Sequence, residues 1–110
     1  MANPDLRQLK IKTGVVKRLT KEKCSYEKEV ETETSKLNKM KKDKADEYTI
    51  RKQHEILQES RAMIPDCQRR LEAGVDDLEK FMKGHAKLSE ENKEEYEYAK
   101  IALKEASKSK

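Results

Sequence analysis

The chain of 110 residues is short enough for one domain, and its composition is extreme: 44% of the residues are charged, 34% are hydrophobic and 5% are aromatic. A compact mixed α/β core needs more apolar and β-branched side chains than this, which argues against such a fold. So few apolar residues stabilise a fold only when they form narrow stripes, as in coiled coils and slender helical bundles. Disorder is the competing interpretation, and the periodicity of the apolar residues decides between the two.

The net charge of +4 is concentrated in the first thirty residues, which hold eight Lys or Arg and four Asp or Glu. This asymmetry predicts an acidic partner for one end of the molecule. Cys24 and Cys67 lie far apart without a CxxC motif, no apolar run is long enough for a membrane span, and no signal-peptide segment follows Met1. We therefore expect a cytoplasmic protein with reduced thiols and no membrane attachment.

The first helix is expected over about residues 5–41, with Asn3 as its N-cap and Pro4 at its first position. Written in heptads, seven of its ten core positions are apolar, and the others carry long side chains whose charged ends can reach water. The a positions are Leu9, Val16, Lys23, Val30 and Leu37, and the d positions are Lys12, Leu19, Tyr26, Glu33 and Met40.

The second helix is expected over about residues 47–83, after an N-cap at Asp46. Its a positions are Ile50, Leu57, Ile64, Leu71 and Leu78, and its d positions are Gln53, Ser60, Cys67, Gly74 and Phe81. The heptad phase is unchanged across Pro65, which falls at an outer b position, so a kink is favoured over a break.

A third helix over about residues 89–106 has the shortest stripe, formed by Tyr96, Ala99, Leu103 and Ala106. Three helices joined by short loops predict an all-α fold: an elongated up-down-up three-helix bundle with coiled-coil-like packing. The bundle is expected to form a single domain over residues 1–110.

Catalysis needs polar groups that converge in a concave site, and the sequence contains no such constellation. His54 and His85 have no Cys, Asp or second His at metal-ligand spacing, and no glycine-rich phosphate loop is present. We therefore expect no enzyme activity, no cofactor and no bound metal. Nucleic-acid binding is the weaker alternative, because basic and acidic residues alternate outside one stripe and no aromatic platform accompanies them.

That stripe, at the b and f positions of the first helix, faces away from the predicted core and is mostly cationic. Its members are Arg7, Lys10, Gly14, Lys17, Lys21, Cys24 and Lys28, with Ile11 and Arg18 beside them at c. Like charges at i and i+4, and a glycine costing about 1 kcal/mol relative to Ala, are not explained by helix stability. Two interpretations stay open: a solvated charged face, or a docking stripe for an acidic protein surface.

Two nearly unbroken blocks, about a third of the chain, carry a family resemblance. One begins Ile11-Lys12-Thr13-Gly14-Val15-Val16-Lys17-Arg18-Leu19, and the other begins Glu55-Ile56-Leu57-Gln58-Glu59-Ser60-Arg61 and continues from Met63 to Glu72. Both resemble the tubulin-binding cofactor A family. The resemblance implies a tubulin-folding cofactor that captures quasi-native β-tubulin after chaperonin release, stabilises it without ATP and passes it toward αβ-heterodimer assembly. Tubulin surfaces are acidic, which agrees with the basic stripe.

The resemblance also implies a cytoplasmic, cytoskeleton-associated location, and β-tubulin and other tubulin-folding cofactors as partners. We expect a monomer, with a homodimer as the alternative. In the second block, Glu59, Asp66 and Arg69 fall at outer positions and Arg61 and Arg70 flank the core, where partner contact and ion pairing are equally good interpretations. The alternative function is that of a structural coiled-coil module.

Overall fold

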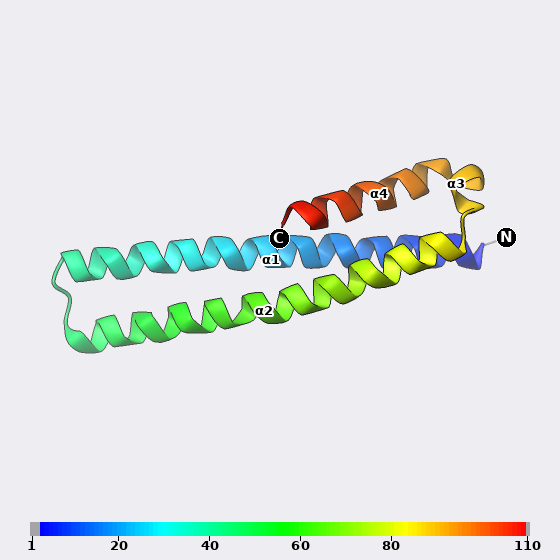
Figure 1. Ribbon diagram of the computed structural model, residues 1–110. Coiled ribbons are helices and arrows are strands. Elements are labelled where there is room, and N and C mark those ends of the chain that lie inside the picture. The colour runs from blue at the N-terminus through cyan, green and yellow to red at the C-terminus, as the bar shows by residue number, and fades with distance from the viewer. Residues whose placement is uncertain (1–2, 110) are drawn as a thin grey trace. The chain divides into compact units, whose positions relative to one another are not determined.

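The computed structural model describes residues 3–109, and every element in that range is a helix (Figure 1). The long helices are α1 (Pro4–Lys42) and α2 (Glu47–Gly84), followed by the short α3 (Leu88–Glu91) and by α4 (Lys93–Lys108). The expectation of an all-α bundle is confirmed. The first two residues and the last residue of the predicted 1–110 domain lie outside the described residues.

The third predicted helix is in fact two helices, because the backbone leaves the helical conformation at Asn92. That residue has φ −135° and ψ 61°, so α3 ends there and α4 begins at Lys93. Neither of these helix starts has a side-chain cap. The prediction of one uninterrupted helix over 89–106 was therefore wrong, since an apolar period alone does not report a single non-helical residue.

The helix starts predicted from the sequence are confirmed for α1 and α2. The Asn3 side-chain oxygen accepts the backbone N–H of Asp5 at 2.9 Å, which satisfies one of the otherwise unpaired donors of the first turn. Before α2, the Asp46 carboxylate accepts the Thr49 hydroxyl and the Asp46 carbonyl accepts the Ile50 N–H at 3.1 Å. The hydrogen bond from Thr49 lowers the pKa of the Asp46 carboxyl below its usual value of 3.8.

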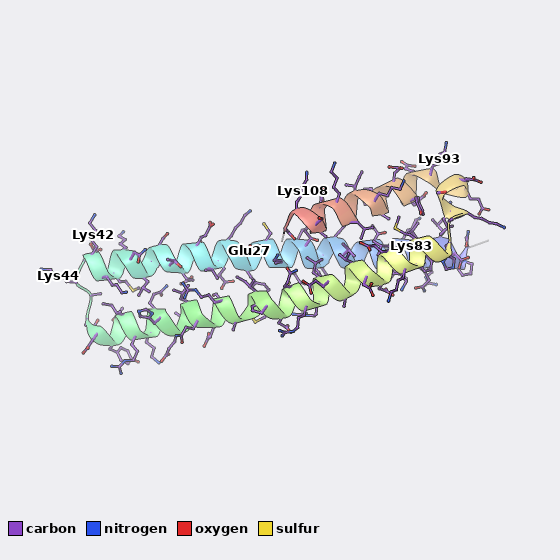
Figure 2. All side chains as sticks on the ribbon, viewed as in Figure 1. Glu27, Lys42, Lys44, Lys83, Lys93 and Lys108 are labelled. Atoms are coloured by element: carbon purple, nitrogen blue, oxygen red, sulfur yellow. The ribbon has the colours of Figure 1, made fainter. Side chains whose placement is uncertain are left out.

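Helix α1 ends in a Schellman motif whose left-handed residue is a lysine. The Ala45 N–H donates to the Met40 carbonyl at 2.9 Å, and the Lys44 N–H donates to the Lys41 carbonyl at 3.2 Å. Lys44 has φ 58°, a conformation in which a side chain is strained and glycine is not. Figure 2 shows Lys42 and Lys44 at the loop that joins the two long helices.

The chain divides into two compact units: Met1–Lys21 with Arg69–Lys110, which we call the three-helix unit, and Glu22–Gln68, which we call the hairpin unit. Helices α1 and α2 each contribute to both. The single domain expected from the sequence stays a prediction.

The three-helix unit combines three longer helical segments, the start of α1, the end of α2 and α4, with the short α3. Its core includes predicted a and d residues together with three alanines of α4: Leu9, Val16, Leu19, Leu71, Leu78, Ala99, Ala102 and Ala106. Val15, Val16 and Leu19 lie 3.6–3.7 Å from the Cβ position of Gly74, so a small residue there allows close helix packing. The Lys12 ammonium, at a predicted d position, reaches the Asp77 carboxylate at 2.7 Å.

The hairpin unit is an antiparallel helix pair with a partly polar seam. Leu37, Leu57 and Cys67 are buried, and so is Gln53, whose amide donates to the Glu33 carbonyl oxygen at 3.0 Å and to the Glu33 carboxylate at 2.6 Å. Because its polar group is paired, a buried glutamine is tolerated at this d position.

Pro65 lies inside α2, which continues through it without interruption, and its ring is exposed, as expected for an outer heptad position. The helix is thus unbroken at Pro65, and the kink stays a prediction. Ile64, one residue before it, is half-buried in phase with Leu57 and Leu71. Among the described residues, no helix is long and apolar enough to cross a bilayer.

Candidate functional site

The basic face of α1 is the candidate binding surface; we use this name for Arg7, Lys10, Gly14, Lys17 and Lys21, all in the three-helix unit. Arg7, Lys10, Gly14 and Lys21 are exposed, whereas Lys17 is half-buried. The b and f positions of one helix therefore present a row of ammonium and guanidinium groups on one surface, as the heptad assignment predicts.

Helix α4 runs beside this face, and Tyr98 makes the contact (Figure 1). The Lys17 ammonium donates a hydrogen bond to the Tyr98 hydroxyl and lies 3.7 Å from the centroid of the Tyr98 ring. Lys17 was expected to face solvent or a partner, and the structure shows it engaged within the chain. Lys10 and Lys21 are the more accessible cations of the face.

A hollow of about 330 Å³ lies between α1 and the start of α4. It is lined by Lys10, Thr13, Gly14, Lys17, Glu94, Glu95 and Tyr98. The two glutamates bring negative charge next to the lysines, but among the described residues no ion pair joins Lys10 or Lys17 to either of them. The hollow thus offers an apolar floor with charges of both signs at its edge.

Gly14 forms part of that floor, and the fold does not require a glycine there. A Cβ added to Gly14 would meet no atom within 4 Å, whereas one added to Gly74 would lie 3.6 Å from the Val15 side chain. Glycine in a helix interior costs about 0.5–1 kcal/mol relative to alanine. The glycine at position 14 keeps open space over the basic face at the expense of helix stability.

Exposed apolar side chains accompany the basic face on both helices. Ile11 of α1 is 48% exposed, and Tyr98 and Ile101 of α4 are 52% and 51% exposed. Ile11 was among the residues predicted from the sequence, whereas Tyr98 and Ile101 were not. The sequence contained one indication of them, because both residues lie outside the apolar stripe of Tyr96, Ala99 and Leu103. Apolar residues outside the stripe are not expected to pack in the core.

The other predicted contact residues are divided between the two units. Lys28, Glu59 and Arg61 are exposed in the hairpin unit. Arg69 and Arg70 are exposed in the three-helix unit. Arg18, Asp66, Arg69 and Arg70 all have interaction partners within the chain. For Asp66, Arg69 and Arg70, partner contact and ion pairing both stay predictions.

The histidines have ordinary surroundings. His54 is exposed, and His85 stacks on Phe81 with the ring centroids 4.1 Å apart while its Nδ1 lies 2.8 Å from the Phe81 carbonyl oxygen. Within residues 3–109, no three His, Cys, Asp or Glu side chains are placed to hold a metal ion. The arrangement that remains is a charged helical surface with exposed apolar side chains, which suits contact with another protein.

The chain is similar to known proteins over most of its length. Residues 4–103 match the family model described as tubulin binding cofactor A. The chain is 56% identical over 103 residues to tubulin-specific chaperone A of Rattus norvegicus, covering 94% of each chain.

Two solved structures are similar in fold and sequence. The human tubulin chaperone cofactor A superposes with a TM-score of 0.81 at 50% identity, over 94% of this chain and 99% of that one. Tubulin folding cofactor A from Arabidopsis thaliana gives a TM-score of 0.80 at 42% identity, over 94% and 96%. The chain belongs to the tubulin-binding cofactor A family.

Proposed function

We propose that this chain captures quasi-native β-tubulin after its release from the chaperonin and passes it toward αβ-tubulin heterodimer assembly, working in the cytoplasm with other tubulin-folding cofactors. The observation that carries the proposal is the family match, which covers almost the whole chain at high identity to a protein named tubulin-specific chaperone A. The basic face supports it physically, because a row of exposed cations favours an acidic client.

The mechanism requires no chemical step. A protein that binds one conformational state of a client lowers the free energy of that state by mass action and reduces the concentration of the free, aggregation-prone form. Such binding consumes no ATP. Handover then needs only a competing partner that binds the client more tightly.

The proposed contact surface is the basic face together with Ile11 and the exposed apolar residues of α4. Lys10 and Lys21 supply long-range attraction, which raises the association rate more than the final affinity. Ile11, Tyr98 and Ile101 supply apolar area that is half exposed in the free chain. The other predicted contact residues remain candidates: Arg18, Lys28, Glu59, Arg61, Asp66, Arg69 and Arg70.

Charge reversal at two exposed positions tests the proposal. A Lys10→Glu/Lys21→Glu double variant should weaken capture of purified β-tubulin in a native-gel shift while the helical circular dichroism stays unchanged. Lys17 is left intact because it also contacts Tyr98. The matched control is Lys42→Glu/Lys44→Glu, which makes the same change in net charge in the hairpin unit, at the end of α1 and in the loop that follows it (Figure 2).

The proposal predicts a complex with the unmodified chain at micromolar concentrations, formed equally well after ATP has been removed with apyrase. Absence of any complex, or a complex that forms only with ATP, would contradict it. Equal loss of capture in both double variants would indicate a general charge effect and would remove the basic face from the contact surface.

A further inference from the structure

The hairpin unit carries a groove that none of its own elements covers. The groove has a volume of about 550 Å³ and lies between α1 and α2 on the side of their g positions. Its apolar lining residues are Tyr26, Ile56, Ala62 and Met63, and its charged lining residues are Glu29 and Glu59. All of these residues belong to the hairpin unit, so the groove is a property of that unit alone.

The exposure of the apolar lining is not explained by the fold. Ile56 is 44% exposed and Met63 is 38% exposed. In the three-helix unit α4 covers the opposite edge of its helix pair, the edge of the e positions, and buries Ala99, Ala102 and Ala106 there. Residues 22–68 contain only two helical segments and their loop, so the hairpin unit has no third helix to cover its apolar edge.

The charge of the groove distinguishes it from the basic face. Both of its charged lining residues are glutamates, although the whole chain carries a net charge of +4. The Glu29 carboxylate accepts only a long 3.3 Å hydrogen bond from the Ser60 hydroxyl, and the Glu59 carboxylate has no hydrogen bond or ion pair among the described residues. These two carboxylates, one on each helix, are therefore available to cationic groups of a partner.

The spacing of the apolar residues suits a helical partner. Ile56 and Met63 are seven residues apart on one edge of α2, so their Cα atoms are about 10 Å apart along the helix axis. A helix that lies in a groove presents its anchors at i, i+3 or i+4, and i+7, which spans the same length.

We propose that this groove binds an amphipathic helix of another protein, one whose apolar stripe is flanked by Lys or Arg. The apolar stripe covers Tyr26, Ile56 and Met63, and the flanking cations pair with Glu29 and Glu59. The bound helix completes a local three-helix arrangement in the unit that lacks one. The proposal does not depend on β-tubulin being the client.

The experiment uses the full chain and a synthetic peptide of about 20 residues, long enough to form a helix, with Leu at the a and d positions, Lys beside them and Ala elsewhere. Fluorescence anisotropy of the labelled peptide should show binding that weakens with added salt. The same peptide with Glu in place of Lys should bind at least about tenfold more weakly.

Two groove variants and two matched controls locate the binding. Ile56→Ser/Met63→Ser and Glu29→Lys/Glu59→Lys should each weaken binding by about tenfold or more, since they remove apolar contact and reverse the rim charge. The control for the apolar variant is Tyr48→Ser, which removes a side chain that is 65% exposed in the same unit. The control for the charge variant is Glu27→Lys, which reverses an exposed charge at an e position of α1 (Figure 2). Both control variants should bind the peptide as tightly as the original chain does. Circular dichroism checks folding, and the charge variants alter only exposed positions.

No binding of the lysine peptide, equal binding of the two peptides, or unchanged binding by both groove variants would overturn the proposal. Light scattering tests the other possible occupant of the groove, a second copy of this chain. A dimer that the groove variants convert to monomer would assign the groove to self-association and would also overturn it.

Discussion

The Lys17 side chain of α1 contacts Tyr98 of α4 in two ways. Its ammonium donates a hydrogen bond to the Tyr98 hydroxyl and lies 3.7 Å from the centroid of the Tyr98 ring. One residue thus belongs both to the basic face and to the packing of the last helix. Since Tyr98 is 52% exposed, most of the contact is made by its polar end and one ring face. The position of α4 therefore depends partly on a cation that an acidic client would also attract.

Replacing Tyr98 by Ala should loosen α4. A cation–π contact at a half-exposed site is worth about 0.5–1 kcal/mol, so the free energy of unfolding in urea should fall by about that amount. Amides of α4 should exchange with solvent faster, by the factor that corresponds to this loss of free energy. Tyr48→Ala is the matched control, because Lys52 lies 5.6 Å from the centroid of the exposed Tyr48 ring and little should be lost. Equal destabilisation by the two variants would contradict a specific role for the Lys17 contact.

Replacing Gly14 by Ala should stabilise the chain and weaken client capture at the same time. The added Cβ meets nothing within 4 Å, so the gain in helix propensity of about 0.5–1 kcal/mol should be obtained in full. Capture should fall because the methyl group occupies the floor of the hollow. Urea unfolding and the native-gel shift with β-tubulin measure the two effects.

The control for that experiment is Gly74→Ala, whose Cβ would make ordinary contacts at 3.6–3.7 Å inside the helix interface. It should give a comparable propensity gain with no change in capture. If Gly14→Ala were stabilising and captured β-tubulin as well as the original chain, the hollow would have no part in client binding.

Replacing Lys44 by Gly should stabilise the chain by about 1 kcal/mol. Lys44 occupies the left-handed position of the Schellman motif, where an L-residue with a side chain costs about 1–2 kcal/mol and glycine costs much less. The urea midpoint should rise with an unchanged m-value. Lys42→Gly, two residues earlier at the end of α1, should instead destabilise, because there the backbone is helical.

The Asp46 carboxyl should titrate below 3.8 in the folded chain, as measured by the NMR shift of its side-chain carbon. The Thr49 hydroxyl donates to the ionised form and lowers its pKa, so Thr49→Val should move the titration back toward the ordinary value. A pKa depressed by folding means that this hydrogen bond stabilises the folded chain above pH 3.8, and that the contribution disappears as the pH falls through the folded-state pKa. An unchanged pKa in Thr49→Val would assign the shift to the backbone donors of the cap.

If residues 1–110 form the single domain expected from the sequence, the two units should unfold together. The slowest-exchanging amides of the three-helix unit and of the hairpin unit should then report the same free energy of opening and the same denaturant dependence. Leu78 and Leu57 are suitable reporters, since each is buried in a different unit. Two distinct free energies would show that the units unfold separately.

The apolar period was sufficient to predict much of the local structure. Leu9, Val16, Leu57, Leu71 and Leu78 are buried as their heptad positions require, because side-chain direction in a helix follows from residue spacing alone. Asn3 and Asp46 cap their helices because capping is a contact between near neighbours in the chain. For the same reason the basic residues of α1 could be assigned to one outer face.

Only the tertiary structure decided three features: the interruption at Asn92, the contact of Tyr98 with Lys17, and the groove of the hairpin unit. A heptad stripe on two antiparallel helices leaves two edges, formed by the e and the g positions, and the stripe does not select which edge the last helix covers. In the three-helix unit the e residues Thr13 and Met82 are buried beside the core, whereas in the hairpin unit the g residues Ile56 and Met63 stay half exposed. Local spacing determines the direction of each side chain, but packing between segments distant in the chain determines what each side chain contacts.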